Sequence, residues 1–123
     1  MPRPVHFDIS VDDPEAAISF YEKTFGWKFE KWEGPMDYWL ITTGGDDEAG
    51  INGGLARREE QSLPGTVNTL EVKSLDEMIE KVEAAGGRIV APRMAVPGVG
   101  WLAYFADPGG NVFGMMESDE GAA

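Results

Sequence analysis

The feature that most constrains the fold of this chain is an internal repeat with a constant spacing. Gly26 and Gly87, which each follow an apolar helical pattern, are 61 positions apart, and so are Val11 and Val72, which each end a strand-like pattern. Self-similarity at one spacing across several landmarks is typical of a duplicated supersecondary unit. The sequence therefore predicts two copies of the same local fold in tandem.

The first copy opens with signals for a strand and a helix. Residues 5–11 alternate between apolar and polar side chains, which is the period of a strand with one buried face. Asp13 is a candidate N-cap, Pro14 suits the first helical position, and an apolar helical face continues to Gly26. This order predicts a β–α unit.

The second copy has the same order of signals. Residues 67–72 have strand character, and Ser74 with Glu77 forms a capping box before an amphipathic helix that ends at Gly86. Three strand-like runs follow each helix, so each copy is expected to be a βαβββ module. These runs are 27–32, 38–42 and 50–56 in the first copy and 88–91, 101–106 and 111–117 in the second.

Together the two modules predict an α+β fold in a single domain that covers residues 1–123. The first module is expected at about 3–57 and the second at about 66–118. Residues 58–65 are polar and end in Pro-Gly, which is typical of a linker. A hydrophobic fraction of 42% is enough for an ordinary globular core.

The charge balance limits the classes of partner. The chain has 22 acidic and 10 basic residues, which gives a formal net charge of −12. Nucleic acids are bound through neutralised phosphates and anionic membranes repel acidic proteins, so we expect neither as a partner. No apolar run reaches the roughly twenty residues of a membrane span. The sequence has no cysteine, which excludes thiolate sites and fits the expectation of a cytoplasmic protein.

Several stretches carry a family resemblance. Residues 5–27 begin Val-His-Phe-Asp-Ile, and residues 105–117 read Phe-Ala-Asp-Pro-Gly-Gly-Asn-Val-Phe-Gly-Met-Met-Glu. These stretches resemble the opening and ending of the vicinal oxygen chelate superfamily, which includes glyoxalase I, extradiol dioxygenases and bleomycin-resistance proteins. Gly-Ile-Asn-Gly-Gly at 50–54 and Gly-Val-Gly-Trp at 98–101 are similar to its small glyoxalase-like members. The resemblance implies a half-open barrel around a small-molecule cavity.

The resemblance also implies the position of a metal site. Metal enzymes of the superfamily take a histidine from the first strand of each module and a glutamate from the last. His6 and Glu117 match two of these positions, and such ligands suit Zn²⁺, Mn²⁺, Ni²⁺ or Fe²⁺. The repeat places Val67 and Ala56 at the other two positions, and neither can ligate a metal. The expected metal site is therefore incomplete.

Other side chains could line the implied cavity. The alternation of residues 5–11 places Asp8 on the same strand face as His6. Tryptophans near strand starts could form a stacking surface for a planar ligand or could fill the core. Arg57 could bind an anionic substrate or be a surface charge beside the linker. The candidate lining residues are Asp8, Trp39, Asn52, Arg57, Trp101 and Tyr104.

Two functions from different classes follow from these observations. The first is a binding or sequestration protein that holds a small molecule in the cavity beside an incomplete metal site. The alternative is a metal-dependent lyase or isomerase of the glyoxalase type, with His6 and Glu117 as partial ligands. A structural or regulatory role is a third reading. The resemblance further implies a homodimer, and the sequence does not identify the substrate.

Overall fold

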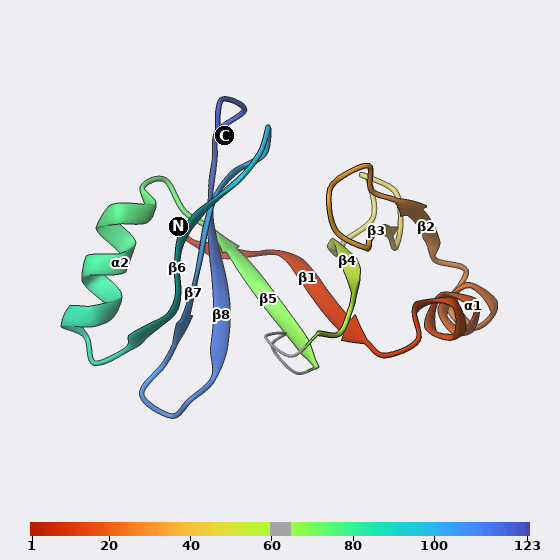
Figure 1. Cartoon of the computed structure of the whole chain (residues 1–123), viewed down its shortest axis with the longest axis horizontal. Helices are drawn as coiled ribbons and strands as arrows, with labels where there is room; N and C mark the ends of the chain where they lie inside the picture. The colour runs from red at the N-terminus through yellow and green to blue at the C-terminus, as the bar shows by residue number, and fades with distance from the viewer. Residues whose placement is uncertain (60–64) are drawn as a thin grey trace. The chain divides into compact units, whose positions relative to one another are not determined.

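The computed structural model describes residues 1–59 and 65–123, which form eight strands and two helices (Figure 1). The first half contains β1 (Arg3–Val11), α1 (Pro14–Phe25), β2 (Lys28–Lys31), β3 (Tyr38–Thr42) and β4 (Asn52–Arg57). The second half contains β5 (Thr66–Glu71), α2 (Leu75–Ala84), β6 (Arg88–Val96), β7 (Gly100–Ala106) and β8 (Val112–Ser118). The order βαβββ occurs twice, so the expected α+β class and the duplicated module are confirmed.

The strands of the first module are ordered β2-β3-β4-β1. Strands β1 and β4 are parallel, whereas β2, β3 and β4 form antiparallel pairs. In this register His6 lies opposite Asn52, and Asp8 lies opposite Gly54. The first and last strands of the module are therefore neighbours, which brings residues far apart in the sequence onto one face.

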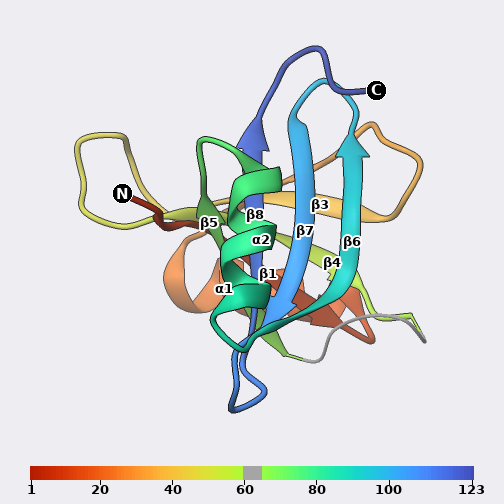
Figure 2. The same ribbon diagram turned by 90° about the vertical axis from the view of Figure 1, so that its left-hand side faces the viewer.

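The second module repeats this topology in the order β5-β8-β7-β6. Strands β5 and β8 are parallel, and Thr69 lies opposite Gly114. Helix α2 covers one face of β6, β7 and β8 (Figure 2). Strand β6 is longer than the sequence predicts because it continues its hairpin with β7 past a register shift at Ala91. Hairpin pairing of this kind overrides a weak local strand signal.

Each half has its own core. In the unit formed by Met1–Val5 and Asn68–Ala123, Leu75 and Met115 are fully buried, and Met78, Ile79 and Val82 of α2 pack against them. In the unit His6–Val67, Leu55 and Ile41 are fully buried. An aromatic cluster lies between α1 and the strands there, with Tyr21 stacked 5.1 Å from Trp27 and Phe7 6.0 Å from Trp27.

The helix ends have the expected caps. The Asp13 carboxylate accepts a hydrogen bond from the Ala16 N–H at 3.2 Å, and the Ser74 hydroxyl accepts one from Glu77 at 3.3 Å. Gly26 ends α1 with φ of 72°, a left-handed conformation that favours glycine. The central part of the expected linker, residues 60–64, lies outside the described residues. In the ranges 1–59 and 65–123, neither helix is long and apolar enough to cross a membrane.

Candidate functional site

A polar trio lies on the face of the first module that points away from α1. The Tyr38 hydroxyl donates a hydrogen bond to Asp8 Oδ1 at 2.5 Å. His6 Nε2 is 3.2 Å from the same Asp8 oxygen and 3.0 Å from the Tyr38 hydroxyl oxygen. The side chains of His6 and Asp8 are 32% and 27% exposed, so solvent reaches the trio.

The alternation of β1 explains which side chains reach this face. Phe7 contacts Trp27 in the aromatic cluster beside α1. Because successive side chains of a strand point to opposite faces, His6 and Asp8 point away from that cluster. The sequence predicts that these two residues share a face, and the hydrogen bond between them is consistent with that.

Gly54 makes room for the third member of the trio. Tyr38 belongs to β3, and its side chain crosses β4 over Gly54 to reach Asp8 on β1. A β-carbon added to Gly54 would overlap the hydroxyl and ring of Tyr38. The trio therefore depends on the absence of a side chain at this position.

Two oxygens lie near His6 Nε2, and the Tyr38 O–H points at one of them. These oxygens belong to the Asp8 carboxylate and the Tyr38 phenol. In the tautomer with the proton on Nε2, His6 donates to them and Nδ1 carries the lone pair of the ring.

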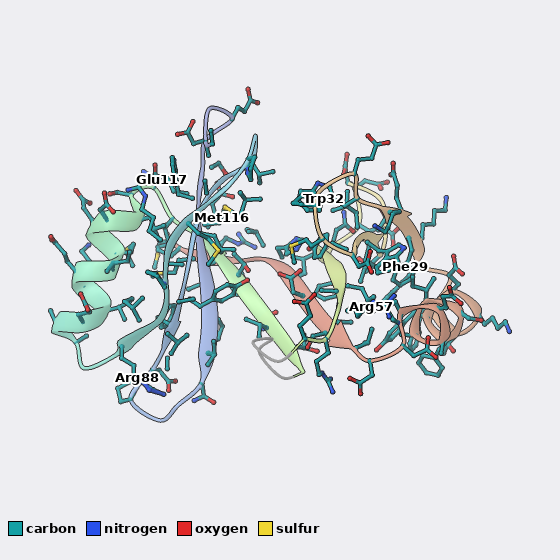
Figure 3. All side chains as sticks on the ribbon, in the orientation of Figure 1. Phe29, Trp32, Arg57, Arg88, Met116 and Glu117 are labelled. Carbon is teal, nitrogen blue, oxygen red and sulfur yellow. The ribbon has the colours of Figure 1, made fainter. Side chains whose placement is uncertain are left out.

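Glu117 has a different environment, at the start of α2 in the second module (Figure 3). Its Oε1 accepts a hydrogen bond from the backbone N–H of Leu75 at 2.8 Å. Leu75 begins α2, and the first N–H groups of a helix have no partner within it. Glu117 therefore satisfies a helix end, and a negative charge at that end is favourable.

Neither environment meets the needs of a divalent metal. Among the residues that the structure describes, no group of three or more His, Asp or Glu side chains is spaced to hold a metal ion. His6 belongs to one compact unit and Glu117 to the other, and each is committed to a hydrogen bond within its unit. In these positions the side chains do not fit a metal site.

Trp39 and Arg57 lie on the opposite face of the first module from the trio. Trp39 pairs with the buried Leu55, and Lys31 Nζ lies 5.3 Å from the centre of the Trp39 ring. Arg57 Nε bonds to Asp37 Oδ2 at 3.2 Å. This bond lowers the pKa of Asp37 from its ordinary value of 3.8. The structure therefore does not bring Trp39 or Arg57 together with Asp8.

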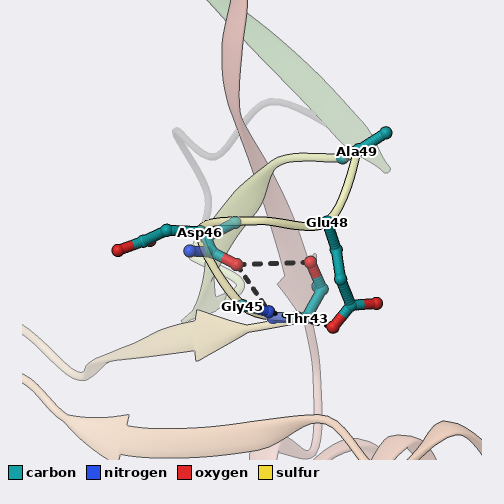
Figure 4. A pocket seen from close by; sticks show the side chains of 8 residues that line it. Thr43, Gly45, Asp46, Glu48 and Ala49 are labelled. Atoms are coloured by element: carbon teal, nitrogen blue, oxygen red, sulfur yellow. Dashed lines mark hydrogen bonds between the residues drawn. The ribbon is translucent and has the colours of Figure 1, made fainter.

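Asn52 lies beside His6 in the register of β1 and β4, on the face of the trio. Its Oδ1 accepts hydrogen bonds from the backbone N–H of Thr43 at 2.9 Å and from the Thr43 hydroxyl at 3.2 Å. These bonds close the loop between β3 and β4, which surrounds a small polar pocket (Figure 4). Asn52 therefore holds this loop at the edge of the trio.

Trp101 and Tyr104 belong to the second module. Trp101 Nε1 donates to Asp119 Oδ2 at 3.0 Å, and Arg93 lies 4.4 Å over its ring. The bond from Trp101 is the main cause of a lowered pKa at Asp119. Tyr104 lies opposite Gly114 on the other face of β7. Trp101 thus packs on the side of α2, and Tyr104 does not.

The sequence pattern does not indicate Tyr38 or Gly54 as site residues. In the sequence Gly54 belongs to a glycine motif, and Tyr38 begins a predicted strand. Their role follows from the parallel register of β1 and β4, which no local pattern encodes. A tyrosine at the start of a strand whose partner strand contains Gly-Gly is the signal that could indicate such a crossing.

A sequence model of the Glyoxalase/Bleomycin resistance protein/Dioxygenase superfamily matches residues 3–115. CFP32 of Mycobacterium tuberculosis, provisionally named a glyoxylase, is 26% identical over 118 residues, which cover 91% of this chain and 44% of that protein. The anthracycline biosynthesis protein DnrV of Streptomyces peucetius is 27% identical, over 95% of this chain and 49% of that protein. This chain thus spans about half the length of these relatives.

Solved structures share the fold. Methylmalonyl-CoA epimerase from Mycobacterium tuberculosis matches with a TM-score of 0.72 and 19% identity, over 94% of this chain and 87% of that chain. The Mn(II)-bound glyoxalase from Novosphingobium aromaticivorans matches with a TM-score of 0.61 and 25% identity, over 99% of this chain and 40% of that chain. The expected fold is confirmed, and the chain belongs to the Glyoxalase/Bleomycin resistance protein/Dioxygenase superfamily.

Proposed function

We propose that this chain binds a small molecule without a metal, on the face of the first module that carries His6, Asp8 and Tyr38. The observation that carries the proposal is that these three side chains are hydrogen-bonded to one another while solvent still reaches them. A small number of convergent polar groups is one feature of ligand sites. The binding or sequestration role is therefore favoured over a metal enzyme.

The relatives are consistent with a small-molecule ligand. One structure with the same fold is a methylmalonyl-CoA epimerase in complex with methylmalonyl-CoA, at a TM-score of 0.73 and 14% identity, which supports the fold alone. DnrV is named for anthracycline biosynthesis. This chain covers about half of DnrV. A ligand related to that of DnrV is therefore proposed for this chain and is not assigned to it by the similarity.

The test combines metal analysis with ligand binding. The purified protein is dialysed against Mn²⁺, Zn²⁺ or Ni²⁺ and then analysed for bound metal, in parallel with His6→Ala. We expect substoichiometric metal in both. In a thermal-shift panel of neutral, anionic and cationic small molecules, we expect at least one to raise the melting midpoint equally with and without EDTA, because a ligand stabilises the state that it binds. Stoichiometric metal that His6→Ala removes would contradict the proposal.

The alternative is a metal-dependent lyase or isomerase with His6 and Glu117 as ligands. It is supported by the Mn(II)-bound glyoxalase of the same fold. It requires a ring nitrogen of His6 with a free lone pair, and it requires Glu117 to leave the Leu75 N–H. The same dialysis decides this case, because here both His6→Ala and Glu117→Gln are expected to abolish metal binding.

A homodimer remains a proposal. Strand β6 stands at the end of the strand order, and Val90 and Met94 on it are 38% and 41% exposed. Exposed apolar residues on an edge strand favour pairing with a second copy. Light scattering during size exclusion is expected to give the mass of a dimer, and Met94→Lys the mass of a monomer. A monomeric wild-type protein would contradict this proposal.

A further inference from the structure

The Asp8 carboxylate retains hydrogen-bonding capacity toward a ligand. Both contacts described for it, from Tyr38 and His6, use Oδ1. An ionised carboxylate has about four lone-pair sites on two oxygens, so Oδ2 can accept from a further donor. The side chain is 27% exposed, and a molecule on this face can therefore reach it.

The electrostatics of this face disfavour an anion. In the hydrogen-bonded trio Tyr38 and His6 both donate, and Asp8 is the acceptor. The register of β2 places Lys28 and Glu30 on the same face, where their opposite charges offset each other. The whole chain has a net charge of −12, which repels anions over longer distances. A neutral ligand that donates a hydrogen bond fits best.

The surroundings of the trio favour a flat, apolar molecule. The Trp32 ring meets the Tyr38 ring edge to face, with centroids 5.9 Å apart. Leu40, opposite Gly54 on β3, is 43% exposed. Gly54 itself has no side chain, and the Tyr38 side chain lies directly over it. Rings stack on aromatic and aliphatic surfaces of this kind.

We propose that the site selects neutral hydroxylated aromatic compounds, whose hydroxyl donates to Asp8 Oδ2 while the ring packs against Trp32, Tyr38 and Leu40. This inference rests on the proposed metal-free binding function and specifies its ligand class. A hydroxyl that donates to a carboxylate forms a charge-assisted bond, which is stronger than one between neutral groups. Asp8 is accordingly the residue that determines specificity.

Three matched naphthalenes test the inference by titration calorimetry in EDTA at pH 7. They are 2-naphthol, 2-methoxynaphthalene, which keeps the ring and oxygen but cannot donate, and 2-naphthoate, which is an anion. We expect 2-naphthol to bind the wild-type protein at least about tenfold more tightly than 2-methoxynaphthalene does. We expect 2-naphthoate to bind most weakly. Equal affinities for 2-naphthol and its ether in wild type would overturn the inference without any variant.

The variant Asp8→Asn removes the charge and keeps the shape. We expect it to reduce the preference for 2-naphthol over the ether to within about threefold and to strengthen naphthoate binding. The control Asp12→Asn removes the same charge from an exposed position near the end of the module's first strand, and is expected to retain the wild-type preference. A preference that survives in Asp8→Asn, or that is lost equally in Asp12→Asn, would overturn the role of Asp8.

The outcomes separate this inference from the proposed function. If the naphthalenes bind without regard to the hydroxyl, the ligand class is wrong and metal-free binding stands. If none of the three binds wild type, the ligand class is also wrong. The metal dialysis and the small-molecule panel described above then decide independently whether the binding function fails as well.

Discussion

The two modules share one topology and use equivalent positions differently. In the first module Asp8 lies opposite Gly54 on the parallel last strand, and in the second Thr69 lies opposite Gly114 in the same way. Asp8 is 27% exposed at its side chain, whereas Thr69 is 5% exposed. The glycine of the last strand is common to both modules, but only the first surrounds it with an exposed charged group.

The carboxylates of the two modules also differ in role. Asp8 bonds to the side chains of His6 and Tyr38, whereas Glu117 bonds to a backbone N–H at the start of α2. The position equivalent to His6 is Val67, which is buried. In the second module the carboxylate of the last strand bonds to the backbone, whereas in the first module the carboxylate of the first strand bonds to side chains that solvent reaches.

The largest effect is expected from the second module's core. Leu75→Ala removes a fully buried side chain that packs in the cluster with Met115, and should lower the free energy of unfolding by about 2–5 kcal/mol. The same change at the exposed Leu40 of the first module should cost within about 0.5 kcal/mol. Urea unfolding measures both, and equal losses would show that the two positions do not differ as described.

Substitution of the glycine in the last strand is expected to affect ligand binding in the first module only. Gly54→Ala forces Tyr38 away from Asp8, so we expect a loss of about 1–3 kcal/mol in stability together with loss of 2-naphthol binding. Gly114→Ala meets Thr69 Oγ1 at 2.9 Å, and should lower stability while leaving 2-naphthol binding intact. Unfolding and calorimetry on both variants check this, and it fails if Gly114→Ala is the one that abolishes binding.

Glu117 should act as a cap. Glu117→Ala leaves the Leu75 N–H without its partner and should cost about 1 kcal/mol of stability. Glu117→Gln keeps an acceptor oxygen and should recover part of that loss. The measurement is urea unfolding of both variants with the wild type as reference. If Glu117→Ala leaves stability unchanged, the carboxylate has no capping role.

The smallest effects concern two exposed acids with lowered pKa values, one in each module. Asp37 bonds chiefly to Arg57, and Asp119 chiefly to the indole N–H of Trp101. A carboxyl with a lowered pKa stabilises the fold above its ordinary value of 3.8, and this contribution is lost as the pH falls through the lower folded value.

Salt distinguishes these two acids. Ionic strength screens the ion pair of Asp37 with Arg57 more than the hydrogen bond from the neutral indole to Asp119. In unfolding experiments below pH 4, we expect Asp37→Asn to reduce the acid sensitivity of stability only at low salt, and Asp119→Asn to reduce it at low and high salt alike. The same salt response for both variants would contradict the assignment of Arg57 as the main partner of Asp37 and of Trp101 as the main partner of Asp119.

The sequence predicts the fold better than the site. The constant spacing of Gly26 and Gly87 is enough to predict two βαβββ modules, because caps, helix ends and strand patterns are local signals. The alternation of β1 likewise predicts that His6 and Asp8 share a face. The contribution of Tyr38 depends on non-local pairing of β1, β4 and β3, which no short pattern specifies.

The direction of the Glu117 side chain shows the same limit. The sequence places it near the end of the last strand, but the face on which a side chain lies depends on a register that one residue can invert. In the structure the side chain of Glu117 lies on the same face of β8 as that of Met115, which packs against α2. A motif at a strand end therefore predicts the strand more reliably than the direction of its side chains.

The central claim is a metal-free ligand site in the first module. The most direct test is an NMR titration of the ¹⁵N-labelled wild-type protein with 2-naphthol in EDTA, followed by amide chemical shifts in ¹H–¹⁵N correlation spectra. We expect the largest amide shifts at His6, Asp8, Tyr38 and Gly54, and small shifts around Glu117 and Leu75. Shifts that centre on Glu117 and the start of α2, or that occur only after a divalent metal is added, would contradict a metal-free site in the first module.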